Sequence, residues 1–257
     1  MSIKYKNPPI NELVIGVYFD RDVASLRSEY VGVFWNRLRD NFPIISEMPL
    51  LTRPINLFVD LPLVEFSNMP RYWLESADGT TLIQIQRNAF LMNWRRRNTE
   101  YPHYDAVKAF FDMMFLKFVA FLNEELHEPL PRIQLAELNY TNVVEPSEFW
   151  SSWIDTAKVL PRFSLAVPTN DDSRLADFLQ VTVEKFAPDL ALQTTVRSGR
   201  EVKDLTKPVL IFELRAVGLI TETESTSPWF RRAHELTGRR FTEMTNPDIQ
   251  AAYWQPR

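Results

Sequence analysis

The chain has 257 residues, and its 33 acidic side chains outnumber its 29 lysines and arginines, which gives a formal net charge of −4 at pH 7. A chain with this charge is not expected to bind nucleic acid through its overall electrostatic potential, although a local basic patch stays open as an alternative. It has no cysteine, which excludes disulfides, thiolate zinc sites and cysteine nucleophiles.

The glycines and the start of the chain exclude two further classes. The six glycines are spread along the sequence, and no two lie close together. Phosphate-binding loops need clustered glycines, so neither a P-loop nor a dinucleotide-binding loop is expected. The N-terminus has no apolar stretch behind a basic start, and charged residues interrupt the longest apolar runs. We therefore expect a cytoplasmic protein with no membrane partner.

Two patterns organise the first half of the chain. Asp78-Gly79 lies between two strand-like segments and predicts a hairpin over residues 71–87, while the apolar side chains of residues 105–125 repeat at helical spacing. Residues 44–70 are rich in proline and are expected to be irregular, with a short apolar stretch at residues 55–59. The full set of expected elements is strands over residues 10–19, 71–76, 81–87 and 133–142 and helices over residues 25–40 and 105–125.

The second half repeats the order of strands followed by a helix. Residues 145–161 are expected to form a connector with a short helix at 147–157. Val181, Thr182 and Val183 favour a strand over a helix, because β-branched side chains are typical of sheets. Ser227 and Pro228 are typical of the start of a helix. The expected elements are strands over residues 162–167, 177–186, 190–197 and 208–217 and helices over residues 227–244 and 248–254.

The element order predicts an α+β fold with two similar halves, each an antiparallel sheet covered on one face by helices. The halves are residues 1–144 and 162–257, joined by the connector at residues 145–161. Only the order of the elements supports this similarity, since no residue-level repeat is visible.

Several segments together resemble one bacterial protein family. They are PPINELVIGVYF, LRDNFP, LIQIQRNAFLMNWRRR, YPHYD and RRAHELTGRRFTEMT, and they span nearly the whole chain. The most specific parts are PPI-N-E, the Q-x-Q-R segment that leads to NWR, and YP-x-Y. The family they resemble is sporadically distributed and uncharacterised, so the resemblance assigns no catalytic residue. A patchy distribution implies an accessory module, such as a defence or toxin–antitoxin locus.

The segment NWRRRNTEYPHY, residues 93–104, is the most unusual stretch of the sequence. Arginine side chains bind phosphate and carboxylate groups through two parallel hydrogen bonds, and aromatic rings beside them can stack on bases. The alternative is a surface turn whose aromatic rings pack on the core while the arginines pair with carboxylates. Both interpretations stay open. The candidate binding residues in and before this stretch are Gln84, Gln86, Arg87, Trp94, Arg95, Arg97, Tyr101 and Tyr104.

Other polar groups give weaker signals. Gln84 and Gln86 share one face of a strand, which is either the solvated side of a sheet or the lining of a cleft. Glu137 and Asn139 also share a face, and with Glu12 they could form a carboxylate cluster, but no reaction follows from it. No metal site is predicted from the isolated histidines, and arginines of the last helix are typical of a charged outer face. These groups are His103, His127 and His234, and Arg231, Arg232, Arg239 and Arg240.

The sequence therefore favours a non-enzymatic binding or interaction protein without a cofactor. Seven tryptophans and eight tyrosines favour another protein, or self-association, as the partner, because these residue types are enriched at interfaces. Two alternatives stay open. One is nucleic-acid binding through residues 87–104, and the other is an enzyme with a carboxylate-based site in a cleft between the halves.

Overall fold

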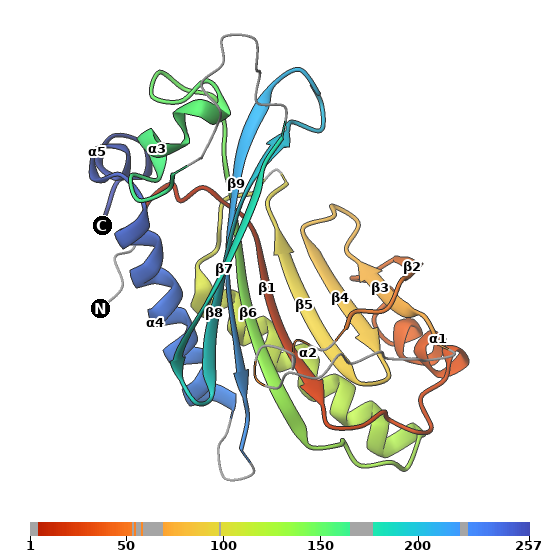
Figure 1. Ribbon diagram of the computed structural model, residues 1–257. Helices are drawn as coiled ribbons and strands as arrows, with labels where there is room; N and C mark the ends of the chain where they lie inside the picture. The colour runs from red at the N-terminus through yellow and green to blue at the C-terminus, as the bar shows by residue number, and fades with distance from the viewer. Residues whose placement is uncertain are drawn as a thin grey trace.

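The computed structural model describes residues 5–52, 54, 58, 69–97, 99–164, 177–221 and 226–257. They form one antiparallel nine-stranded sheet, in the order β2-β3-β4-β5-β1-β6-β9-β8-β7, with helices packed against it (Figure 1). The strands are β1 Ile10–Phe19, β2 Ile44–Met48, β3 Arg71–Glu75, β4 Thr81–Gln86, β5 Ala89–Arg95, β6 Ile133–Val144, β7 Leu179–Ala187, β8 Leu190–Arg200 and β9 Pro208–Leu219. The helices are α1 Ser28–Asn36, α2 Tyr104–Glu125, α3 Thr156–Val159, α4 Thr226–Met244 and α5 Pro247–Ile249, with a 3-10 turn at Trp153–Asp155 and a π turn at Gln250–Trp254.

The expected α+β class is confirmed, but the two halves do not have a sheet each. Strand β6 of the first half pairs with β1 on one side and with β9 of the second half on the other. Tyr140, for example, lies between Leu13 and Leu214 in the register. The strands of both halves thus form one continuous sheet, because β6 has backbone groups to share with neighbours on both sides.

Helix α2 packs one side against the sheet, as its apolar repeat predicts. Phe118 is fully buried, and its ring lies 5.1 Å from that of Phe90 on β5 and 5.6 Å from that of Phe34 on α1. The buried side chains recur at the spacing of a helix that covers a core. They are Val107, Phe111, Met114, Phe118, Phe121 and Leu122.

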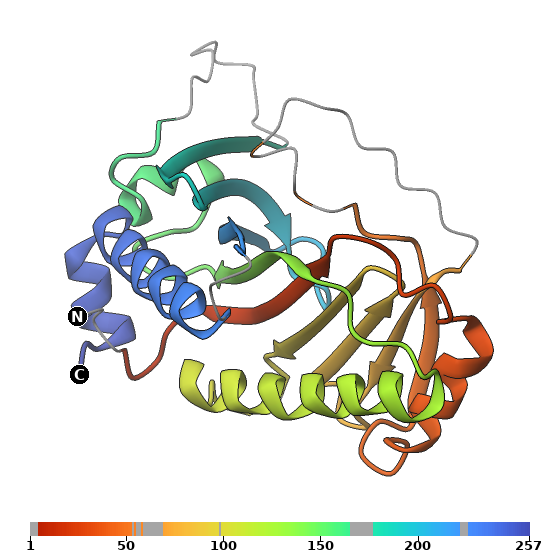
Figure 2. The same cartoon turned by 90° about the horizontal axis from the view of Figure 1, so that it is seen from below.

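Helix α4 lies on the same side of the curved sheet as α2 (Figure 2). The two helices meet where the ring of Phe230 lies 5.9 Å from that of Phe111. The ring of the neighbouring Trp229 packs directly on β9, where a Cβ atom added to Gly218 would lie only 1.8 Å from Nε1 of the tryptophan. The indole N–H donates to the carbonyl of Asp189 at 3.1 Å. Glycine at position 218 is what lets the helix come this close.

The opposite face of the sheet carries a second, smaller apolar cluster. Leu51 and Phe58 pack over it, which places parts of the chain between β2 and β3 on this face. The buried members of the cluster are Val14, Tyr18, Ala89, Leu91, Leu135 and Val217. The central strands are therefore covered on both faces.

Local signals placed most elements correctly. The hairpin is confirmed by β3 and β4, with Gly79 in the turn at φ 70°, a conformation that glycine adopts without strain. The expected strand at residues 177–186 is β7, and the expected last helices are α4 and the turns of residues 247–254. Strands β2 and β5 were not predicted. In β5 every residue from Ala89 to Trp94 is buried, so the alternation that marks a strand is missing.

Three expected elements differ from the structure. The first helix is confined to Ser28–Asn36, and the connector has only α3 and the turn before it. Residues 162–164 are a turn and coil in place of a strand, while residues 165–167 lie outside the described residues, as does most of the apolar stretch at 55–59. Of the helices that the structure describes, none has the length and apolar character needed to cross a bilayer.

Candidate ligand-binding site

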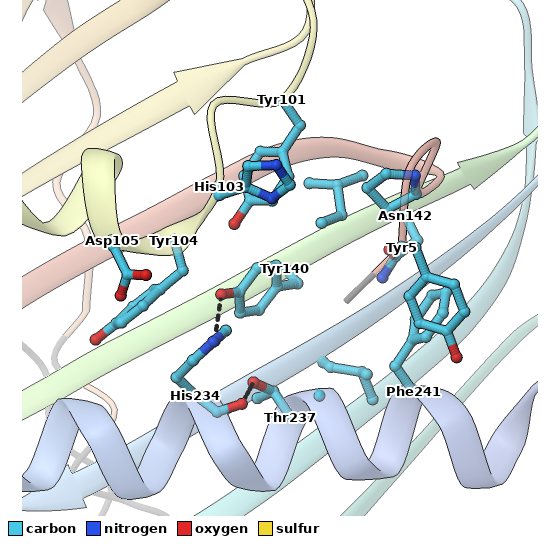
Figure 3. A pocket seen from close by; sticks show the side chains of 14 residues that line it. Tyr5, Tyr101, His103, Tyr104, Asp105, Tyr140, Asn142, His234, Thr237 and Phe241 are labelled. Carbon is cyan, nitrogen blue, oxygen red and sulfur yellow. Dashed lines mark hydrogen bonds between the residues drawn. The ribbon is translucent and has the colours of Figure 1, made fainter. Parts of the chain in front are cut away.

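A pocket of about 90 Å³ lies on the helix-covered face, between the first turn of α2 and the middle of α4 (Figure 3). The floor is formed by β6 and β9, which contribute Tyr140, Asn142 and Leu214. Seven of the fourteen lining residues carry an aromatic ring. They are Tyr5, Tyr101, His103, Tyr104, Tyr140, His234 and Phe241.

The start of α2 is shaped to bring three of these rings to the pocket. His103 precedes the helix with φ 67° and ψ 156°, a backbone conformation that side-chain-bearing residues rarely adopt. This sharp change of direction follows Pro102 and lets Tyr101, His103 and Tyr104 all line the cavity. A strained backbone of this kind persists only where the surrounding structure holds it in place.

His234 of α4 lies against two tyrosines from other elements. Its ring is stacked on that of Tyr104, with centroids 4.0 Å apart and an angle of 6° between the planes. The Tyr140 hydroxyl lies 2.9 Å from Nδ1 of the same ring, as the dashed line in Figure 3 shows. The pocket therefore connects the sheet, the first turn of α2 and the middle of α4 through one histidine.

The tyrosine hydroxyls of the pocket keep their protons at neutral pH. Burial raises the pKa of Tyr101 and of Tyr104, and it raises the pKa of Tyr140 well above its usual range. The nearby charge of Asp105 acts in the same direction on all three pKa values, and the charge of Arg231 opposes it only in part at Tyr104. The three side chains are therefore neutral groups that donate and accept hydrogen bonds.

Asn142, one of the residues that line the pocket, has a buried acceptor without a partner. The side chain is 1% exposed, and its Nδ2 donates to the carbonyl of Phe212 at 3.2 Å. Its Oδ1 is buried and accepts no hydrogen bond in the part of the chain that the structure describes. A buried acceptor without a donor costs about 1–3 kcal/mol, so a group that fills this pocket gains by donating to it.

The lining residues carry negative charge, while the positive charge of Arg231 acts on Tyr104 from outside the lining. Asp105, in the first turn of α2, is exposed at the pocket wall. None of the fourteen lining residues is a lysine or an arginine. The pocket is therefore aromatic, rich in oxygen acceptors and without a fixed positive charge on its side chains.

Of the eight binding residues expected from the sequence, Tyr101 and Tyr104 line this pocket and the other six lie elsewhere. Trp94 is buried beneath Tyr101, with ring centroids 5.2 Å apart. The arginines are spread over separate contacts. Arg87 donates to the carbonyls of Val23 and Ala24 and pairs with Asp22. Arg95 pairs with Glu75 and donates to the Gly79 carbonyl. Arg96 donates to the Pro8 carbonyl, and Arg97 is exposed near Gly79.

Gln84 and Gln86 share a face of β4 as expected, but this face is buried. The Gln84 side chain accepts from Arg71 at 2.6 Å and donates to Asn93 at 2.6 Å, and Asn93 in turn donates to Glu12 at 2.7 Å. Gln86 exchanges two hydrogen bonds with the backbone of Leu51, both at 3.0 Å. The amide groups on this buried face thus hydrogen-bond one another and the backbone of Leu51, which packs over the face.

The carboxylates on that face do not form one cluster. Glu137 accepts two hydrogen bonds from Arg215, at 2.9 and 2.7 Å, and one from the Tyr18 hydroxyl at 2.7 Å. Burial raises the pKa of Glu12, which is only partly offset by the bond from Asn93 and the nearby charge of Arg95. Each carboxylate has its own partners, and the buried oxygen of Asn139 has none in the described residues.

The arginines of α4 differ in their contacts: Arg231 is exposed, and Arg239 lies 3.9 Å from Glu243. Arg232 pairs with Asp189, and Arg240 pairs with Glu184 at 2.5 Å while lying over the Phe186 ring. Among the described residues, no three histidine, aspartate or glutamate side chains lie close enough to hold a metal ion.

Sequence reasoning missed Tyr140, Asn142 and His234 as members of one site. His103 and His234 look isolated because 131 positions separate them, from 103 to 234, and only the packing of α4 brings them to one cavity. Tyr140 and Asn142 alternate on β6 like ordinary core residues. The one visible signal is an asparagine on the buried face of a strand, which is unusual for a core.

No protein-family model, curated protein or solved structure matches this chain. The resemblance to a bacterial family stays an expectation, and the site is interpreted from its geometry.

Proposed function

We propose that the protein is a non-enzymatic binding protein whose pocket between α2 and α4 takes a small ligand. The observation that carries this proposal is the buried Oδ1 of Asn142, a residue of the aromatic pocket, which has no donor among the described residues. Ligand sites are commonly apolar hollows with a few polar groups that fix orientation. The family resemblance adds the proposal that ligand binding serves an accessory module of a bacterium.

The strained backbone at His103 supports the same proposal. Strain of about 1–3 kcal/mol is seldom kept without use, and it clusters at sites that hold ligands. Here it orients Tyr101 and Tyr104 toward the pocket. Since Tyr104 is stacked on His234 of α4, a ligand that displaces either ring would also change the contact between α2 and α4.

Filling the pocket tests this function. Gly238 lines the cavity from α4, and a leucine there suits a helix while occupying the space. A fragment library should contain compounds whose saturation-transfer NMR signals with wild-type protein disappear with Gly238→Leu. The matched control is Gly32→Leu on α1, where an added Cβ meets nothing within 4 Å. Fragments that bind the wild type and Gly238→Leu equally would place their site elsewhere, and a library without any binder would count against the proposal.

A second candidate function is self-association through β7. This strand is the last of the sheet, and all of its residues but Ala187 are exposed. Leu179, Val181 and Val183 share one face, with exposed fractions of 67, 49 and 45%. A long, apolar edge strand is a template for pairing with another strand.

The charges of β7 allow antiparallel pairing with a second copy about Val183. Antiparallel pairing about Val183 sets Val181 opposite Lys185 and Thr182 opposite Glu184, so no like charges face each other. Pairing about Glu184 or Lys185 would oppose identical charges, which is destabilising. Sedimentation should show a wild-type dimer that Val183→Lys converts to monomer. Ile45→Lys on the opposite edge strand, β2, should leave the dimer intact, and a wild type that is monomeric at all concentrations would rule this out.

A further inference from the structure

We infer that the ligand of the pocket presents a primary or secondary alkylammonium group. This inference rests on the proposed function, because it assigns a chemical class to the ligand of that same pocket. Three features of the pocket carry it: the sign of its charge, its hydrogen-bonding groups and its size.

The electrostatic character of the pocket favours a cation. Aromatic faces carry negative charge density, and a cation within about 6 Å of a ring centre is attracted to it. Four tyrosine rings line this cavity, Asp105 lies at its wall, and no lysine or arginine is among the lining residues. The first turn of α2 carries the partial positive charge of a helix N-terminus, but Asp105 lies in that same turn and opposes it.

The hydrogen-bonding groups favour a cation that bears N–H. Oδ1 of Asn142 is an amide oxygen and can only accept, while Nδ2 donates to the Phe212 carbonyl. A quaternary ammonium has no N–H and would leave this oxygen unsatisfied. An ammonium with two or three N–H groups can donate to Asn142 and to a tyrosine oxygen at once, and both acceptors lie on the lining of one cavity.

The size of the pocket limits what enters it. A volume of about 90 Å³ is smaller than the cavity of roughly 150 Å³ that holds a benzene molecule. A short alkylammonium fits, whereas a larger ligand would place only its amine-bearing end inside. Asp105 at the wall is exposed, so the rest of such a ligand would lie in solvent beside it.

A matched set of small compounds tests the inference. Isobutylamine, isobutanol, isobutyrate and tetramethylammonium are titrated into wild-type protein at pH 7 and constant ionic strength, and binding is followed by NMR shifts of the protein. Isobutylamine is protonated at this pH, since alkyl amines of the lysine type have a pKa of about 10.4. We expect it to bind at least about tenfold more tightly than each of the other three.

Two variants separate the contributions. Asp105→Asn keeps the shape of an exposed side chain and should weaken isobutylamine binding about threefold to tenfold, while the isobutanol affinity stays unchanged. Glu29→Gln, which removes the same charge from an exposed position on α1 outside the pocket, is the control. Asn142→Val should weaken isobutylamine by about tenfold or more, with thermal unfolding recorded to show that the variant is folded.

Each outcome decides the inference separately from the proposed function. Isobutanol or isobutyrate binding as well as isobutylamine would overturn the ammonium assignment, and so would tetramethylammonium binding more tightly. No effect of Asp105→Asn and Asn142→Val would also overturn it. The proposed function would still stand in these cases if Gly238→Leu abolished the binding of the fragments, because that test does not depend on charge.

Discussion

The Tyr140 hydroxyl of β6 and Nδ1 of His234 on α4 are 2.9 Å apart, in a pocket where the same histidine ring is stacked on Tyr104 of α2. Because burial holds the pKa of Tyr140 well above its usual range, this hydroxyl keeps its proton and is able to donate it in a hydrogen bond. Three elements that are far apart in the sequence thus meet at one imidazole.

The first prediction concerns this contact. Tyr140→Phe removes the hydroxyl from Nδ1 of His234 and should lower the free energy of unfolding by about 1 kcal/mol, as measured with urea. The ¹⁵N signals of the His234 ring should also move, because its Nδ1 changes partner. Tyr253→Phe is the control, since that hydroxyl bonds Glu148 at the exposed surface. Unchanged ring signals in Tyr140→Phe would show that the contact does not form in solution.

Glu128 gives a prediction about pH. Burial alone would raise its pKa, but hydrogen bonds from the backbone N–H groups of Ser25 and Ala24, at 2.7 and 2.9 Å, outweigh burial and lower the pKa below its ordinary value of 4.5. A lowered pKa means stability that is present above about 4.5 and is lost as the pH falls through the folded-state pKa.

Glu128→Gln should therefore destabilise the protein by about 1.5–3 kcal/mol at pH 7, and the difference should shrink as the pH is lowered below 4.5. Urea unfolding between pH 3 and pH 7 measures it. Glu29→Gln serves as the control, because Glu29 is exposed and its pair with Arg27, at 3.5 Å, lies at the surface. A destabilisation that stays constant over this pH range would argue against the charged hydrogen bonds.

Phe118 tests the packing of α2 on the sheet. Phe118→Ala should lower the free energy of unfolding by about 3–5 kcal/mol, because it opens a cavity between α1, α2 and β5. Phe115 is only partly buried, so Phe115→Ala should cost less. Leu116→Ala, at a position that is 67% exposed, should change stability by no more than about 0.5 kcal/mol. Equal losses at positions 116 and 118 would mean that the helix presents another side to the core.

Gly218 tests the approach of α4 to β9. An alanine methyl would overlap the indole of Trp229 and lie 2.3 Å from the Asp189 carbonyl oxygen. Gly218→Ala should therefore lower the free energy of unfolding by about 3 kcal/mol or more, which would be seen as a lower melting temperature. Adding Trp229→Leu should recover part of this loss, since the two residues are in contact. Gly32→Ala should be neutral or stabilising, because it lies in a helix with free space around it. If the losses in unfolding free energy from Gly218→Ala and Trp229→Leu simply added in the double variant, the overlap would be contradicted.

The sequence predicted those parts of the fold that depend on local patterns. The hairpin at Asp78-Gly79 and the apolar repeat of α2 are visible within twenty residues, and both are confirmed. Strand β5 was missed because its residues from Ala89 to Trp94 are buried on both faces and show no alternation. The single sheet was missed because nothing local indicates that β6 pairs with β9.

The candidate site was predictable only in part, for a similar reason. Tyr101 and Tyr104 were expected to bind a ligand together with neighbouring arginines, whereas the structure places them in a pocket without arginine. Asn142 becomes notable only when its Oδ1 is seen to be buried and without a donor, which depends on the pairing of β6 with β9 and on the packing of α4. Such contacts between distant segments leave no trace in a single sequence.

The position of β6 between β1 and β9 has a consequence for how the chain is made. Six neighbouring strands, from β2 to β6 in the sheet order, are complete once Val144 has been synthesised, but their partner β9 begins only at Pro208. At a synthesis rate of about 5–20 residues per second, the outer side of β6 waits on the order of ten seconds for its neighbour. During that interval a nascent chain exposes a long unpaired strand, so crowded polysomes are where we expect this protein to depend most on chaperones.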